Sequence, residues 1–159
     1  MKNPTSETYE DIITPATGTW IAVVRLYNEC TATLTHLLAP LGVSLLQHEI
    51  LMNLFRTPGL TQQQLAERCF SAKSGISMLV ARFEKEGIVQ RIPAPKDQRA
   101  LSLSLTDAGK SLAVQVVHVQ NNVVTEMAKA YSADDLLIVK DLMERSSVLL
   151  NDLRIRNDD

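Results

Sequence analysis

The chain has 159 residues, of which 45% are hydrophobic and 4% aromatic, and its formal net charge is −2 at pH 7. A chain of this length and composition can bury an apolar core made mainly of aliphatic side chains. The sequence has no internal repeat, no low-complexity tract and only short apolar runs, so we expect a cytoplasmic protein with reduced thiols and without a membrane-spanning or secretory segment.

The first predicted element is a long helix over residues 14–40. Thr14 suits the N-cap position, and Pro15 suits the first position of a helix. Apolar residues then recur at helical spacing as far as Pro40, which predicts a continuous stripe formed by Trp20, Val23, Val24, Tyr27, Leu34 and Leu38.

Two shorter helices follow, and each opens with a capping box. Ser44 is followed by Gln47 at the third helical position, and this helix breaks at residues 58–59. Thr61 is followed in the same way by Gln64. In each pair, the side chain of one residue can accept a hydrogen bond from the free backbone N–H of the other. The buried side of the helix from Thr61 is predicted to contain Leu65, Ala66 and Cys69.

The segment 73–86 predicts an amphipathic helix with two very different faces. The apolar face has the i, i+3, i+4, i+7 spacing and contains Ile76, Leu79, Val80 and Phe83. The opposite face has short, hydroxyl-bearing or cationic side chains, which a helix needs to enter a DNA major groove. A solvated helix face is the alternative. The predicted groove contacts are Ser74, Ser77 and Met78, and Lys73 and Arg82 are predicted to act on phosphate or on local pairing.

A β-hairpin is predicted directly after this helix. Gly87 ends the helix, residues 88–92 form a β-branched strand, and residues 100–105 alternate leucine with serine. The loop at 93–99 contains two prolines and would stand beside the helix pair as a wing. A solvated hairpin with incidental charges is the alternative.

The hairpin also contains cations suited to the minor groove. Lys96 and Arg99 lie near its tip, and Arg91 lies in the strand before it. The negative potential of the minor groove attracts inserted arginine. Asp97 is predicted to pair with Arg99 or to bond turn amides, and so to orient the arginine.

The charge distribution agrees with this interpretation despite the acidic total. Residues 61–110 contain eight Lys or Arg and five Asp or Glu, a balance of +3, whereas the rest of the chain contains eight and thirteen, a balance of −5. Binding to phosphate depends on the local patch of charge. The helix-and-hairpin segment is therefore where a DNA partner is expected.

Two further helices complete the chain. One starts at Thr106 and runs to about Tyr131, and the other is capped by Ser132 and ends near Arg156. Together with the first helix they have more apolar surface than a small DNA-binding lobe needs, and such surface usually marks an interface. We expect a homodimer that binds a pseudo-palindromic operator with half-sites about 34 Å apart. Packing within one chain is the alternative.

The run from residue 60 to residue 110 resembles the winged-helix core of the multiple-antibiotic-resistance regulator (MarR) family. The most diagnostic piece is DQRA at 97–100, followed by the alternating strand and LTDAG at 105–109. The resemblance implies a mainly α fold with a small β-wing, and a single domain over 1–159. In that domain 14–40 and 106–156 are dimerisation helices and 44–105 is the winged helix-turn-helix lobe.

The resemblance also implies a transcriptional regulator, a repressor of nearby genes that is released by a small phenolic or aromatic ligand. Ala72, Ala94 and Gln98 depart from the residues usual in the family. They leave open a second interpretation, a dimeric helical adaptor that has lost DNA binding. A ligand pocket carried over from the family would draw on Trp20, Tyr27, His36 and His48, which are otherwise core or interface residues.

Little in the chain suggests catalysis or metal binding. Cys30 and Cys69 are the only cysteines, without a second thiol or histidine at a metal-ligand interval. The histidines are scattered, without a paired acid, a nucleophile or a Gly-rich phosphate loop. We therefore expect no enzyme, no metal and no cofactor. A redox-responsive regulator that uses Cys30 remains an alternative.

Overall fold

The computed structural model describes residues 8, 13–94 and 97–158, with the backbone alone at positions 15, 94, 97–100 and 158. The chain divides into two compact units, residues 1–119 and residues 120–159, which are considered separately.

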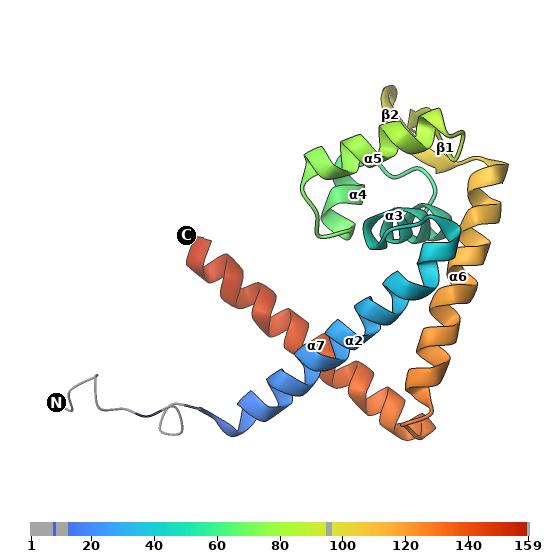
Figure 1. Ribbon diagram of the computed structural model, residues 1–159. Helices are drawn as coiled ribbons and strands as arrows, with labels where there is room; N and C mark the ends of the chain where they lie inside the picture. Colours follow the sequence, from blue (N-terminus) through green and yellow to red (C-terminus); the bar gives the residue numbers. More distant parts are fainter. Residues whose placement is uncertain (1–7, 9–12, 95–96, 159) are drawn as a thin grey trace. The chain divides into compact units, whose positions relative to one another are not determined.

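The first unit contains mostly helices and one hairpin (Figure 1). The elements appear in the predicted order, which confirms a mainly α winged helix-turn-helix fold. They are α2 (Pro15–Leu38), the 3-10 turn η2 (Ala39–Leu41), α3 (Leu45–Arg56), α4 (Gln62–Arg68), α5 (Lys73–Lys85), β1 (Val89–Ala94), β2 (Asp97–Leu105) and the first part of α6 (Asp107–Ala128).

The predicted capping boxes are present and fix where the helices begin. The Ser44 backbone N–H donates to Gln47 Oε1 at 2.9 Å, and the Gln47 N–H donates to Ser44 Oγ at 3.4 Å. Thr61 and Gln64 repeat the arrangement at 2.9 and 3.2 Å. Thr14 is the N-cap of α2, as expected. Local chemistry therefore sets these boundaries before any tertiary packing does.

The hairpin is longer than the sequence indicated, and the predicted loop at 93–99 is wrong. The antiparallel ladder runs from Val89↔Leu105 to Pro93↔Leu101, with a register shift before Ala94↔Asp97. Both strands lie at an edge of this two-stranded sheet, so a proline that lacks an N–H does not interrupt the ladder. The chain before α4 adds a bridge to β2, because the Leu103 N–H donates to Leu60 O at 2.8 Å.

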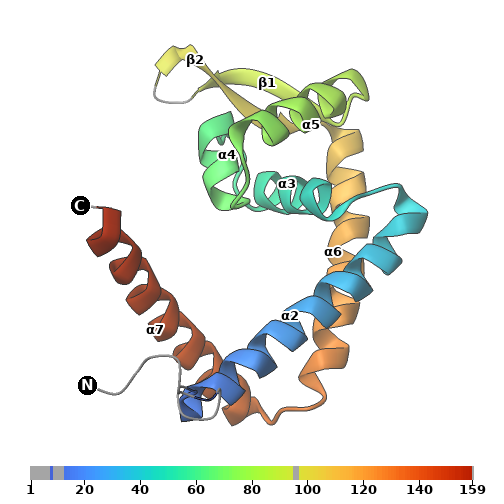
Figure 2. The ribbon, with the colours of Figure 1, turned by 60° about the vertical axis from the view of Figure 1, so that its left-hand side comes forward.

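The core of this unit lies under the hairpin, between α3, α5 and the start of α6 (Figure 2). Ser102 is fully buried, against its expected place on a polar face, and its hydroxyl donates to Ile92 O at 3.2 Å. Leu101, in contrast, is 54% exposed because it lies beyond the core. The fully buried side chains include Leu38, Ile50, Leu51, Leu65, Ile76, Val80 and Val116.

The junction between the hairpin and α6 is unusually close. The Thr106 hydroxyl donates to Gly87 O at 2.5 Å, and the Gly109 N–H donates to Thr106 Oγ1 at 3.1 Å. A Cβ on Gly109 would lie 2.0 Å from Ile88 O, so only glycine fits there. The start of α6 is therefore fixed against the end of α5 and the beginning of β1.

The second unit contains the end of α6 and α7 (Ala133–Asp158). Ser132 caps α7 as predicted, since the Asp135 N–H donates to Ser132 Oγ at 3.2 Å. The hydrogen bond from the Ser132 hydroxyl, and next its backbone N–H, lowers the pKa of Asp135. The apolar side chains of α7 are exposed, including Leu136, Leu137, Leu142, Leu149, Leu150 and Leu153.

Among the described residues, no single helix has the length and apolar character needed to cross a bilayer, and only the bent pair 16–41 and 45–56 meets that test jointly.

Candidate nucleic-acid interface

Helix α5 turns one face into the core and leaves the other to solvent, as its sequence predicted. Ile76 and Val80 are fully buried and Phe83 is 2% exposed. Packing on three successive turns fixes the rotation of the helix about its own axis. The outward face is therefore set by the core and does not depend on a ligand.

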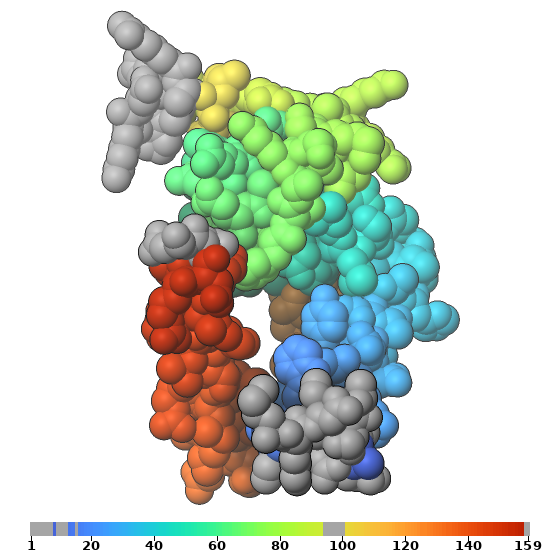
Figure 3. All heavy atoms as spheres, turned by 90° about the vertical axis from the view of Figure 1, so that its left-hand side faces the viewer, coloured from blue at the N-terminus to red at the C-terminus, as the bar shows by residue number. Residues whose placement is uncertain are grey.

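The outward face of α5 is small, polar and open. Ser74 and Ser77 are exposed, Met78 is 68% exposed and Lys73 stands at the first helical position. No described acidic side chain is ion-paired with Lys73. Figure 3 shows the α4 and α5 surface, in green, open to the viewer. The face has the short hydroxyls and the cation that close approach to DNA requires.

Two of the arginines predicted to contact DNA form ion pairs with carboxylates in this structure. Arg82 Nε lies 2.7 Å from Glu86 Oε1, four residues along the chain. Arg91, in β1, donates from Nε and Nη2 to the two oxygens of Glu84, in α5, at 2.7 and 3.0 Å. The i, i+4 spacing could have indicated the first pair. The second joins the hairpin to α5, and only the fold brings it together.

The three predicted contacts at the tip of the hairpin lie outside the described side chains. Lys96 is outside the described residues, and of Asp97 and Arg99 only the backbone is described. The predicted pairing of Asp97 with Arg99 therefore stays a prediction.

The four residues predicted to line a ligand pocket differ in their surroundings. Trp20 and Tyr27, in α2, are 63% and 67% exposed, whereas His48, in α3, is 3% exposed. His36 is exposed near the end of α2. A ligand site that uses all four residues stays a prediction.

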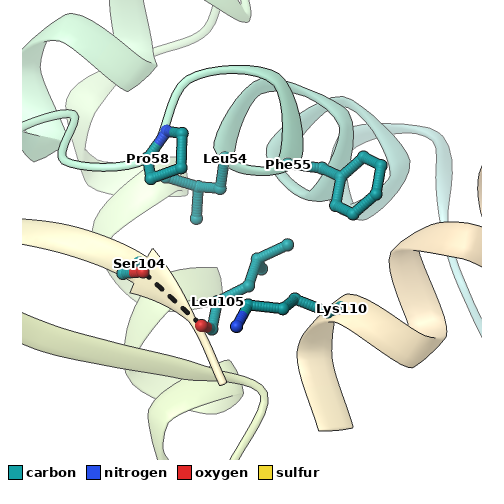
Figure 4. Close-up of a pocket in the computed structure, with 6 residues that line it drawn as sticks. All are labelled: Leu54, Phe55, Pro58, Ser104, Leu105 and Lys110. Carbon is teal, nitrogen blue, oxygen red and sulfur yellow. Dashed lines mark hydrogen bonds between the residues drawn. The ribbon is translucent and has the colours of Figure 1, made fainter. Parts of the chain in front are cut away.

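A small cavity lies elsewhere in the first unit, between the end of α3, β2 and the start of α6 (Figure 4). Its volume is about 100 Å³, and Lys110 is its one charged lining residue. The other lining residues are Leu54, Phe55, Pro58, Ser104 and Leu105.

Neither cysteine forms a disulfide, and the described residues contain no group of three or more His, Cys, Asp or Glu that could hold a metal ion. Burial, and next the charge of Glu49, raises the pKa of the Cys69 thiol from 9.0 to about 11, although Asn53 donates a hydrogen bond to its sulfur. The thiolate is the reactive form, so the raised pKa lowers the reactivity of Cys69.

This shift predicts slow alkylation of Cys69 in the folded protein. A rise of two pKa units, from 9.0 to about 11, lowers the thiolate fraction at pH 8 by about 100-fold. Iodoacetamide labelling at pH 8, followed by mass spectrometry of the Cys69 peptide, should therefore be about 100-fold slower in buffer than in urea. Equal rates would show that Cys69 is not shielded.

A helix pair, α4 and α5, followed by an antiparallel hairpin defines a winged helix-turn-helix protein. The sequence profile of the MarR family matches residues 41–100, from the end of η2 into β2. This stretch of the chain, from residue 41 to residue 100, is therefore similar to the MarR family. The relatives with printed functions are transcriptional regulators, which agrees with the prediction that the chain is not an enzyme.

Relatives of known sequence point to the same class. An HTH-type transcriptional regulator of Bacillus cereus is 28% identical over 92 residues, 58% of this chain. The match spans 60% of that relative's own length. The HTH-type transcriptional repressor YetL of Bacillus subtilis is 26% identical over 149 residues, which covers 90% of this chain and 89% of YetL.

Solved structures show the same fold. AbsC, a MarR family transcriptional regulator from Streptomyces coelicolor, has a TM-score of 0.76 at 23% identity, over 87% of this chain and 97% of AbsC. CouR from Rhodococcus jostii RHA1, solved with p-coumaroyl-CoA bound, has a TM-score of 0.71 at 18% identity, over 77% of this chain and 87% of CouR.

Proposed function

We propose that the chain is a sequence-specific, DNA-binding transcriptional regulator that places α5 in the major groove. The observation that carries this proposal is the outward face of α5, where Lys73, Ser74 and Ser77 stand open while the opposite face is locked into the core. A rigid helix with short polar side chains can approach base edges without rearrangement. Lys73 would contact phosphate, and the serines would contact bases.

The hairpin would contact the neighbouring minor groove through residues near its tip. The Arg91–Glu84 pair joins β1 to α5, so the hairpin and the helix would dock as one body. Lys96 and Arg99 are the proposed contacts there. Arg82 and Arg91 would either keep their ion pairs with Glu86 and Glu84 or leave those carboxylates to bind phosphate.

We propose further that the protein acts as a homodimer and binds a pseudo-palindromic operator. It would do so in the cytoplasm, where its DNA partner lies. The exposed apolar side chains of α2 and of α7, taken separately, support an interface with a second copy. Two copies related by a two-fold axis would present two α5 helices to half-sites about 34 Å apart.

Repression relieved by a small aromatic ligand is the proposed regulation. YetL is named as a repressor, and CouR was solved with p-coumaroyl-CoA, an aromatic thioester. A ligand regulates binding only if it favours one conformation of the dimer over the other. Titrating aromatic acids and their thioesters into a protein–operator mixture tests this, and unchanged affinity across the panel would refute it.

Salt dependence tests DNA binding itself. A footprint across the DNA flanking the gene supplies the site, and its affinity is then measured by fluorescence anisotropy at increasing KCl. Six or more phosphate contacts predict a loss of about 10³-fold between about 50 and 200 mM salt. A helical adaptor without DNA binding would instead show no saturable binding at any salt concentration.

A further inference from the structure

The turn between α4 and α5 has a helix ending that normally requires glycine. After the C-cap Cys69, the backbone N–H of Phe70 donates to Glu67 O at 3.2 Å. The N–H of Ser71 donates to Ala66 O at 3.1 Å. These two bonds form a Schellman motif, whose left-handed residue is usually glycine. Here that residue is Phe70, with φ of +46°.

Phe70 makes no packing contact within the described chain that would offset the cost of its left-handed backbone. It is 97% exposed, so its ring rests on no described part of the chain. A large aromatic side chain stabilises a protein by being buried, and a left-handed backbone disfavours any residue with a Cβ. Both effects favour glycine at position 70, and a strained, fully exposed aromatic residue therefore points to a contact outside the chain.

We propose that Phe70 is a DNA contact at the edge of the major groove, a role that rests on the proposed function of α5. Phe70 lies three residues before Lys73, so their Cα atoms are at most about 11 Å apart. DNA seated on the start of α5 would then lie within reach of the ring. Duplex DNA offers apolar partners there, since the thymine C5-methyl group is exposed in the major groove.

Substitutions of Phe70 distinguish a contact with DNA from a role in stabilising the fold. Phe70→Gly should raise the urea midpoint of unfolding because it relieves the turn, and should lower operator affinity about tenfold per half-site, as expected for one buried aromatic side chain. The salt slope should stay unchanged, since Phe70 neutralises no phosphate. Phe70→Tyr, which keeps the ring, should stay within about twofold of the wild type.

Two further probes sharpen the outcome. Phe70→Asn also tolerates a left-handed backbone, so it should repeat the loss of affinity without the added flexibility of glycine. Deoxyuridine is substituted for each thymine of the half-sites in turn, and at least one substitution should weaken wild-type binding without weakening Phe70→Gly binding.

The result that overturns the inference is a Phe70→Gly protein that binds the operator as tightly as the wild type. If the wild type still shows steep salt dependence, the proposed function stands, and the ring is assigned to a protein partner instead. If the wild type binds no DNA at all, both proposals fall.

Discussion

Gly109→Ala is expected to lower the free energy of unfolding by at least about 3 kcal/mol, the upper range for overpacking a close contact. The added Cβ would lie 2.0 Å from Ile88 O and 3.0 Å from Ile88 C. These are backbone atoms, held by hydrogen bonds from Thr106, so they cannot move aside as a flexible side chain would. Relief would require α6 to separate from the hairpin. Urea denaturation followed by circular dichroism measures the loss.

Gly18→Ala is the matched control in the same unit. Gly18 lies inside α2, and a Cβ there would meet nothing within 4 Å. Because alanine is the better helix former, this variant should be more stable than the wild type by about 0.5–1 kcal/mol. If both substitutions shifted the urea midpoint alike, the close approach of α6 to Ile88 would not exist in the folded protein.

The elements that the sequence predicted well are those whose signals are local. Ser44 and Thr61 predict where two helices begin, because a capping box depends on only four consecutive residues. Ile76 and Phe83 reveal the buried side of α5 because one helix face repeats every three or four residues. The exposed face followed from the same periodicity, without knowledge of any partner.

The details that the sequence missed depend on contacts between distant residues. Pro93 was predicted to lie in a loop, but it lies in a ladder that only the pairing of β1 with β2 defines. The ion pair of Arg91 with Glu84 was not predicted, because these two residues meet only once the hairpin folds against α5. The left-handed backbone at Phe70 had no signal, because the residue that usually marks such a turn is absent.

The largest functional effect is expected from Ser77→Glu, which should reduce operator affinity at least about 100-fold while leaving the fold intact. Ser77 is exposed in the middle of α5, so a glutamate there would place a negative charge close to the anionic phosphates, and its longer side chain would hinder close approach to the base edges. It would also stand four residues after Lys73 and pair with it, which would withdraw a phosphate contact. Fluorescence anisotropy measures the affinity, and the urea midpoint shows whether folding is preserved.

Gln115→Glu adds the same charge at an exposed position of α6 in the same unit. It should change the affinity by no more than about twofold, because Gln115 belongs to neither α5 nor the hairpin and salt screens charges that do not contact DNA. This comparison distinguishes two physical causes. If both glutamates weakened binding equally, the loss would come from the overall charge of the protein, and nothing would tie DNA to α5. A loss confined to Ser77→Glu requires that the base edges and phosphates lie against the outward face of that helix, because a single charge has so large an effect only at short range.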